Sequence, residues 1–431
     1  MTTSTVVTAA TPARTPEGAA FEYVIPPPLE LPSHVETIDA RITGNAHGLI
    51  AIDPVTATVN TIWAENERPW DIDVYPSLAG GGDGVWLSWD NGTIESIRYD
   101  LDGNEVDRVP GLWAQESEDG EVVTYYTAPS GEERHYVARY PNHTADLGSG
   151  TCCGVIAADG RIAFLGPFEG DGQSLLLYDP ATREISVLAD GIGRPAKDGV
   201  IYPSWSPSER YVMDFTFDQK DPPASQTILA DTSTGTVTLR DRTAVEWWIA
   251  GREGADWIGR LDGGDLQFTL ASDGTEALRL SQPDTQYTGM ADLGGAIAAY
   301  AETPEGMAAI VYDLDGNELG RWVGEFWYVT QTADGLAAIE VAYQPARGVC
   351  ASSVIDHPNF EGEVGCVGTG GRWSPDGRFF ASLPPATSGG SIYIFDAAAG
   401  EGRIYETGRD DLSITWSADS SRLVVRIGGP A

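Results

Sequence analysis

The stretch WSPDGRFFA at residues 373–381 places a tryptophan before a compact polar turn and an apolar run directly after it. Two related stretches have the same order, WSPSERYV at residues 205–212 and WSADSSRL at residues 416–423. Proline, glycine, serine and aspartate favour turns, whereas the aromatic and aliphatic residues that follow favour strands. Each stretch therefore predicts the end of one strand, a tight turn and the start of a second strand.

Turns of two kinds alternate along the rest of the chain. Further turns of the first kind begin at Asp83, Asp119, Asp159 and Asp334. The second kind places an acid and small residues after an apolar run, as in YDPAT at 178–182, DTSTG at 231–235, YDLDG at 312–316 and FDA at 395–397. Each kind recurs at intervals of about 40 to 50 residues, so one period holds two hairpins. Two hairpins form a four-stranded antiparallel unit, which is the blade of a β-propeller.

The phase of these turns predicts how the two ends of the chain meet. The first hairpin, residues 48–65, is of the second kind, and the last hairpin, residues 412–426, is of the first kind. Each end thus supplies half a blade, and pairing them in one sheet closes a ring without an exposed edge. Counting both kinds of turn gives about nine units, whereas propellers typically have four to eight blades. We expect an all-β fold, a single closed propeller with eight or nine blades, with the count favouring nine.

The tryptophan turns resemble the W-S-P-D-G-[KR] motif of the WD40-like (PD40), TolB-type propellers. Trp205, Trp373, Asp376, Gly377, Trp416 and Asp419 are the motif residues in this chain. We interpret them as structural, because the tryptophan packs between sheets and the acid and glycine shape the turn. Peptidases that carry such propellers also need an α/β-hydrolase domain with a G-x-S-x-G elbow, and none is evident. The resemblance therefore implies a fold and not an activity.

The charge balance limits the class of partner. The chain has 64 acidic and 26 basic residues, a formal net charge of −38. Such a field repels phosphate backbones and anionic lipid headgroups, so nucleic acid and membrane surfaces are disfavoured. No run of about 20 apolar residues could span a bilayer. A protein partner remains the favoured class.

Catalytic and metal signatures are missing from the sequence. The five histidines are scattered, and no H-E-x-x-H or C-x-x-C spacing is present. The repeat DLDGNE at residues 100–105 and 313–318 has glycine at the fourth place, not the sixth as in an EF-hand loop, which favours hairpin turns over a weak calcium site. We therefore predict no cofactor, no metal and no catalytic residues, and a binding protein rather than an enzyme.

Aromatic residues concentrate in the middle of the chain. The candidates for a binding surface are Trp247, Trp248, Trp257, Trp322, Trp327 and Tyr328. Most such residues pack between blades, and any that lie on one ring face would form a surface for a protein or a sugar.

The cysteines are relevant to the cellular compartment in which the protein is expected. Cys350 and Cys366 flank a turn at residues 357–359, so we predict a cross-strand disulfide between them. The adjacent Cys152 and Cys153 are compatible with a strained vicinal disulfide, with bridges elsewhere or with two buried thiols. A disulfide implies an oxidising compartment, so we expect an extracytoplasmic protein, periplasmic, cell-surface or secreted. No secretion signal is visible in this chain.

Residues 1–34 are rich in threonine, alanine and proline and are expected to be a flexible linker, with the propeller at residues 35–431. Two functions remain. The first is a non-catalytic binding or scaffold propeller that presents an acidic ring face to a protein partner. The alternative is a carbohydrate-active enzyme, a glycoside hydrolase or lyase, that uses carboxylates facing the channel.

Overall fold

The computed structural model describes most of the chain from Glu36 to Gly428. The described ranges are 36–42, 47–65, 75–78, 82–90, 94–127, 134–167, 173–192, 203–217, 225–241, 246–323, 326–332, 335–341, 353–354, 369–383, 390–396, 398–399, 401–409 and 412–428. The predicted linker at residues 1–34 lies outside these ranges. Within them, regular structure is almost entirely β-strand, apart from a short 3-10 turn at Arg252–Gly254. The expected all-β class is confirmed.

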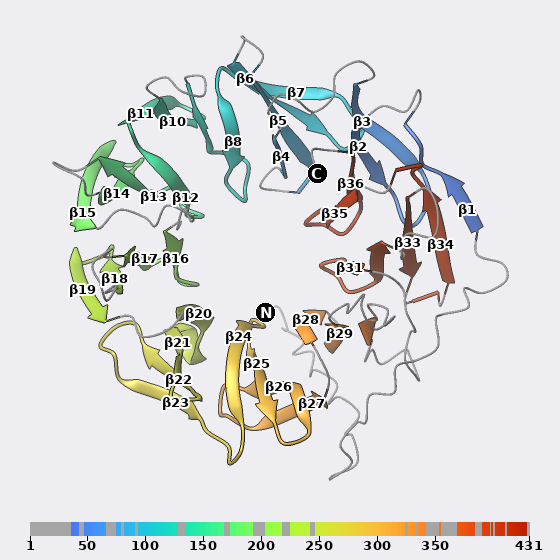
Figure 1. Ribbon diagram of the computed structural model, residues 1–431. Coiled ribbons are helices and arrows are strands. Elements are labelled where there is room, and N and C mark those ends of the chain that lie inside the picture. Colours follow the sequence, from blue (N-terminus) through green and yellow to red (C-terminus); the bar gives the residue numbers. More distant parts are fainter. Residues whose placement is uncertain are drawn as a thin grey trace, which may run out of the picture. The chain divides into compact units, whose positions relative to one another are not determined.

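The chain divides into two compact units, residues 69–279 and residues 1–68 together with 280–431. In the first unit, the described strands form five sheets of four strands each (Figure 1). These sheets are β4 (Tyr75–Leu78), β5 (Gly84–Asp90), β6 (Ile94–Asp100) and β7 (Glu105–Val109); β8 (Leu112–Glu116), β9 (Val123–Tyr126), β10 (His135–Tyr140) and β11 (His143–Ser149); β12 (Cys152–Ile156), β13 (Ile162–Pro167), β14 (Gln173–Asp179) and β15 (Glu184–Ile192); β16 (Ser204–Trp205), β17 (Tyr211–Phe217), β18 (Ser225–Asp231) and β19 (Thr236–Asp241); β20 (Glu246–Ala250), β21 (Asp256–Asp262), β22 (Asp265–Leu270) and β23 (Glu276–Leu280).

The described strands of the second unit form four sheets. They are β24 (Gln286–Asp292), β25 (Ala296–Thr303), β26 (Gly306–Asp313) and β27 (Glu318–Val323); β28 (Phe326–Thr332), β29 (Gly335–Val341) and β30 (Ser353–Val354); β31 (Thr369–Trp373), β32 (Phe379–Leu383), β33 (Ser391–Asp396) and β34 (Glu401–Glu406), with β1 (Glu36–Asp39) added at the edge; β35 (Leu412–Trp416), β36 (Leu423–Ile427), β2 (His47–Ile52) and β3 (Val59–Glu65). Consecutive strands pair antiparallel, which matches the predicted repeat of two hairpins.

The two ends of the chain share one sheet, as the phase of the turns predicts. Strand β2 pairs antiparallel with β36, from Gly48 opposite Ile427 to Ile52 opposite Leu423. Figure 1 shows these blue and red strands side by side. Alternate residues of both strands face the neighbouring sheet, so Ile50, Ile52 and Val425 join one buried cluster with Phe379.

Strand β1 is a fifth strand that the turn pattern does not predict. It pairs with the edge strand β34 in parallel, with Glu36 opposite Arg403 and Asp39 opposite Glu406. The backbone N–H of Ala40 continues the ladder by donating to the carbonyl of Glu406 at 2.8 Å. Strand β1 thus pairs with backbone N–H and C=O groups along the edge of β34 that would otherwise have no partner in the sheet.

The two kinds of turn lie at the same end of each four-stranded sheet. Successive strands run in opposite directions, so the first-to-second and third-to-fourth turns are neighbours, and the second-to-third connection is at the far end. We call the end that carries both turns the turn end. In the sheet of β24 to β27, for example, residues 293–295 and 314–317 form the turn end, and residues 304–305 lie at the other end.

Candidate functional site

The motif tryptophans join neighbouring sheets. The ring N–H of Trp416 donates to the carbonyl of Arg372, which lies in the adjacent sheet, at 3.0 Å. The ring N–H of Trp205 does the same to Val155 at 3.1 Å. Trp373 and Trp416 are 8% and 7% exposed. Trp205 and Trp416 thus each donate a hydrogen bond to the sheet next to their own.

The serine and aspartate of the motif hold the turn itself. In the turn at 374–378, the Ser374 hydroxyl donates to Asp376 at 2.5 Å and accepts the Phe379 N–H at 2.9 Å. Gly377 has φ of 70°, in the left-handed region that glycine adopts without strain. Ser420 takes this place in the last turn with φ of 63°, so the conformation is kept without glycine.

Turns of adjacent sheets within a unit also bond one another. The Asp376 N–H donates to the Ser420 hydroxyl at 2.9 Å, and the Ala158 N–H donates to Glu209 at 2.7 Å. Asp256, which is 7% exposed, accepts from the Ser206 hydroxyl and the Ser208 N–H, each at 2.9 Å. These bonds hold the turn ends of neighbouring sheets side by side.

Carboxylates are concentrated at these turn ends. In six of the described turns between third and fourth strands, an aspartate accepts the N–H of the residue two places later, at 2.8–3.0 Å. These aspartates are Asp53, Asp100, Asp179, Asp231, Asp313 and Asp396. Short acids favour this geometry because their oxygens can bond their own turn. Further exposed acids, such as Asp102 and Asp315, lie beside them.

Hydrogen bonds lower the pKa of several aspartates at the turn ends. The Ser117 hydroxyl, with the Glu121 N–H, lowers the pKa of Asp119. The Arg210 guanidinium, with Ser233, lowers the pKa of Asp231. The Thr275 N–H lowers the pKa of Asp273. At neutral pH the turn ends therefore carry negative charge.

Several of the described arginines form ion pairs with acids of the same chain. Arg108 pairs with Glu95 and with Glu105, and Arg279 pairs with Glu276 at 3.0 Å. Since acids outnumber bases by 64 to 26, the pairs leave an excess of carboxylates at the surface.

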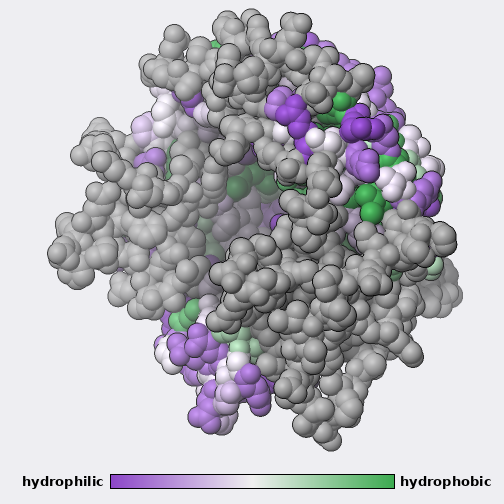
Figure 2. Space-filling view, turned by 45° about the vertical axis from the view of Figure 1, so that its right-hand side comes forward, coloured by the Kyte–Doolittle hydropathy of each residue, from purple (hydrophilic) through white to green (hydrophobic). Residues whose placement is uncertain are grey.

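Exposed hydrophobic side chains are scattered. The large ones among the described residues are Val55, Val106, Ile185, Val187, Leu239 and Leu319, on five different strands or turns. Figure 2 shows one face on which the described outer residues are mostly hydrophilic, with hydrophobic residues as small separate spots. Single exposed aliphatic residues are ordinary and do not mark an apolar interface.

The structure describes the side chains of three of the six residues predicted to form an aromatic surface. Trp247 and Trp248 on β20 are half-buried, and the Trp248 ring N–H donates to the Ser204 hydroxyl of the neighbouring sheet at 3.1 Å. Trp257 on β21 is 3% exposed and packs against Phe268, so it offers no exposed face. For Trp322, Trp327 and Tyr328, the structure describes the backbone of β27 and β28 alone.

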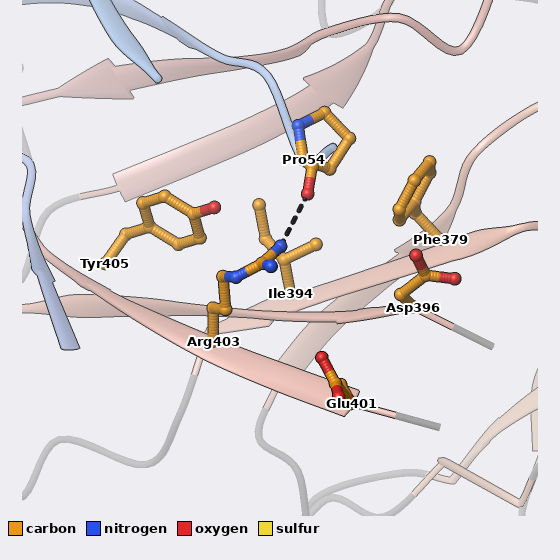
Figure 3. Close-up of a pocket in the computed structure, with 7 residues that line it drawn as sticks. All are labelled: Pro54, Phe379, Ile394, Asp396, Glu401, Arg403 and Tyr405. Carbon is orange, nitrogen blue, oxygen red and sulfur yellow. Dashed lines mark hydrogen bonds between the residues drawn. The ribbon is translucent and has the colours of Figure 1, made fainter. Parts of the chain in front are cut away.

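A small pocket lies at a turn end of the second unit (Figure 3). It is lined by Pro54, Phe379, Ile394, Asp396, Glu401, Arg403 and Tyr405. The pocket has about 180 Å³ of empty space, including solvent at its mouth. Glu401, Arg403 and Tyr405 are alternate residues of β34, so their side chains share one face of the strand.

Arg403 links three segments at this pocket. Its guanidinium donates to the carbonyl of Pro54 at 2.8 Å and to Glu36 of β1 at 3.1 Å. Asp396 is paired with Arg378 at 2.8 Å. Burial raises the pKa of Asp396, but the hydrogen bonds from Arg378 and the Ala399 N–H outweigh it, so the net pKa lies below its ordinary value.

Tyr405 is the most enclosed polar group of the pocket. It is 0% exposed, and the Arg403 side chain is the charged group that faces its hydroxyl. Figure 3 shows this hydroxyl directed toward Arg403 and Pro54. Burial raises its pKa to about 12, so the hydroxyl stays protonated at neutral pH. In the sequence, only the alternation of polar residues along 401–405 indicates that these side chains share one face of a strand.

The remaining predicted groups are only partly described. Cys350, Cys366 and the turn between them lie outside the described residues. Cys152 and Cys153 begin β12, of which the backbone is described at these two positions. In the described ranges, no group of three or more histidines, cysteines and acids is arranged to hold a metal. None of the described helical segments has the length and hydropathy to cross a bilayer.

No protein-family model and no curated protein matches the chain. Solved structures do match it. A eukaryotic initiation factor is similar at 10% identity with a TM-score of 0.53, over 84% of this chain and 96% of that one. Similar structures include the β-propeller domain of the Trilobed protease from Pyrococcus furiosus, at 15% identity and a TM-score of 0.37, over 68% of this chain and 94% of that one. A TolB protein from Agrobacterium tumefaciens is similar at 13% identity and a TM-score of 0.31, over 64% and 90%. At these identities the likeness concerns the fold alone.

Proposed function

We propose that the chain is a non-catalytic binding or scaffold propeller that presents an acidic ring face to a protein partner. In this proposal, residues 35–431 form one closed ring of eight or nine blades, with the sheet of β35, β36, β2 and β3 as its seam. An extracytoplasmic location is part of the proposal and rests on the predicted bridge between Cys350 and Cys366.

The concentration of ionised carboxylates at the turn ends carries this proposal. The aspartates that shape the turns are held in place by backbone N–H groups, so their charges are fixed in position. Fixed charges of one sign steer a partner of opposite charge and select its orientation. The scattered exposed aliphatic residues favour a polar contact over an apolar one. The partner is therefore a protein with a basic surface.

The test is affinity capture from the source organism, with the full chain as bait at about 0.15 M salt. A double variant, Asp102→Asn with Asp315→Asn, removes two exposed charges from turn ends. Its control, Glu302→Gln with Glu305→Gln, removes two exposed charges from the opposite end of the sheet of β24 to β27.

We expect the captured partner to bind the turn-end variant more weakly and with slower association, because exposed charges at an interface act mainly on the association rate. The control variant should bind like the original protein. Recovery of no partner at this salt, or equal binding by both variants, would overturn the proposal.

A further inference from the structure

Strand β15 is the fourth strand of its sheet, which we call the outer strand, and it forms an exposed edge (Figure 1). Among the described strands it pairs with β14 alone. Residues 184–187 pair with residues 176–179 in unbroken register, and the register shifts beyond them. All four residues of this stretch are exposed. Because an edge strand directs alternate backbone N–H and C=O groups away from its one neighbour, the stretch offers these groups to a further strand.

The composition of β15 distinguishes it from the other outer strands. A charged residue inside an edge strand discourages pairing with another chain. The described outer strands with such a residue are β7 (Asp107), β11 (Asp146), β19 (Arg240), β23 (Arg279), β27 (Arg321) and β34 (Arg403). In β15, the five residues from Ile185 to Ala189 are uncharged. Ile185 and Val187, which share one face of the strand, are 44% and 55% exposed. Strand β3 also lacks an internal charge, but its large hydrophobic residues are buried or half-buried.

The same chain shows how an outer strand accepts a further one. Strand β1 adds to the outer strand β34 through the four residues Glu36–Asp39. Opposite charges accompany this pairing, because the Arg403 guanidinium donates to Glu36 at 3.1 Å. The exposed stretch of β15 in regular register has the same length. A short extended segment therefore fits the edge of β15 as β1 fits the edge of β34.

Charge and side-chain pattern define the segment that β15 accepts. Residues 179–190 include three acids and one base, which are Asp179, Glu184, Asp190 and Arg183. Glu184 and Asp190, both exposed, stand at the two ends of the uncharged run, so they attract basic residues at the ends of a bound segment. Between these ends, β-branched residues of the segment match Ile185 and Val187 across the ladder.

We propose that β15 binds an extended segment of the protein partner as a fifth strand. The inference rests on the proposed function, because it names a second contact of the same basic partner. Backbone hydrogen bonds along residues 184–187 hold the segment, and Ile185 and Val187 fix its register. Glu184 directly follows the turn at residues 180–183, so the edge begins at the turn end where the partner docks.

The probe is the peptide Lys-Val-Thr-Val-Lys, amidated at its C-terminus and labelled with a fluorophore at its N-terminus. Its sequence reads the same in both directions, so it suits a parallel or an antiparallel strand. A second peptide has N-methyl groups on its three central amides, which removes backbone donors and keeps the charge and the side chains. Binding of both peptides to the full chain is measured by fluorescence anisotropy at low salt.

Two double variants of the protein complete the design. Ile185→Lys with Val187→Lys changes the edge of β15, because lysine on an edge strand opposes pairing. Val106→Lys with Leu319→Lys is the matched control. It adds the same charge at two aliphatic residues of the outer strands β7 and β27 that are 47% and 45% exposed.

N-methylation should weaken peptide binding by about tenfold, the scale for losing one or two backbone hydrogen bonds. The β15 variant should weaken it by about threefold to tenfold through the loss of two cross-strand pairs, and the control variant by less than about twofold. Equal binding of the two peptides, or equal binding by the two variants, would show charge attraction alone; the β15 site is then wrong while the acidic surface stands. If the original protein binds neither peptide, the β15 site also fails, and affinity capture with the turn-end variant decides the proposed function separately.

The alternative occupant of this edge is a second copy of the chain. We expect no such pairing, because each copy has a net charge of −38 and a four-residue ladder buries far less surface than a stable dimer needs. Size-exclusion chromatography with light scattering should give the same mass for the original protein and the β15 variant. A dimer that the β15 variant abolishes would overturn the proposal of a partner segment.

Discussion

Asp256 shows how one buried carboxylate joins two sheets. It begins β21, yet its oxygens accept hydrogen bonds from Ser206 and Ser208 in the turn of the preceding sheet. Because the carboxylate is 7% exposed, removing it would leave these donors without an acceptor in a buried place. The hydrogen bonds of Asp256 to Ser206 and Ser208 join residues 50 and 48 positions apart in the sequence, so they depend on the fold.

Asp256→Ala should therefore lower the free energy of unfolding by about 2–3 kcal/mol, the scale for hydrogen bonds to a charged group. Asp262→Ala is the control. It removes an exposed partner of Arg279 on the same strand and should cost less than about 1 kcal/mol. Urea unfolding followed by tryptophan fluorescence gives both values. Equal effects would show that the contacts to Ser206 and Ser208 add no stability.

At the scale of elements, the sheet of β35, β36, β2 and β3 depends on both ends of the chain. Strand β36 supplies Leu423, Val425 and Ile427 to the buried cluster, and β2 supplies Ile50 and Ile52. Neither hairpin can bury these residues without the other. The pairing of β2 with β36 is thus both a hydrogen-bonded ladder and a shared core.

Deletion of residues 412–431 should markedly lower the melting temperature and cause aggregation, because it exposes the edge of β2 and part of the core. A chain that ends at Gly428 keeps β36 and serves as the control. Differential scanning calorimetry and light scattering measure the two effects. A melting curve that is the same for both truncated chains would contradict the role given to this sheet.

For the whole molecule, the turn carboxylates govern how stability depends on pH. The pKa values of Asp119, Asp231 and Asp273 are lowered from 3.8 in the folded protein by hydrogen bonds. A group with a lowered folded pKa stabilises the protein above its unfolded pKa, and this contribution is lost as pH falls through the folded value. In the opposite direction, protonation between neutral pH and the pI near 4.2 relieves repulsion among the 64 acids.

We therefore expect the melting temperature to hold or rise as pH falls from about 7 to about 4, and to drop steeply below about pH 4. Added salt at pH 7 should raise the melting temperature by screening the repulsion, and it should have less effect near the pI. Circular dichroism melts across this series test the expectation. Stability that is constant down to about pH 2 would contradict it.

Much of the fold could be predicted because the turn signals are local. The Ser374 hydroxyl bonds Asp376 and the Phe379 N–H, all within one short turn, so the residues that define the turn are adjacent in sequence. The recurrence of such turns then indicated four-stranded sheets, and their phase indicated the pairing of β2 with β36. The aromatic candidates were less informative, because composition does not distinguish the buried Trp257 from the half-buried Trp247.

The sequence by itself determined the strands, the turns and the acidic character of this protein, since each depends on residues close together or on composition. Only the tertiary structure decided where β1 lies, which carboxylates are paired and where a pocket forms. The bond between Glu36 and Arg403 spans 367 residues, and no local pattern specifies such a contact. Folding brings the two residues together because an uncovered edge of β34 can complete its hydrogen bonds by pairing with a strand from elsewhere in the chain.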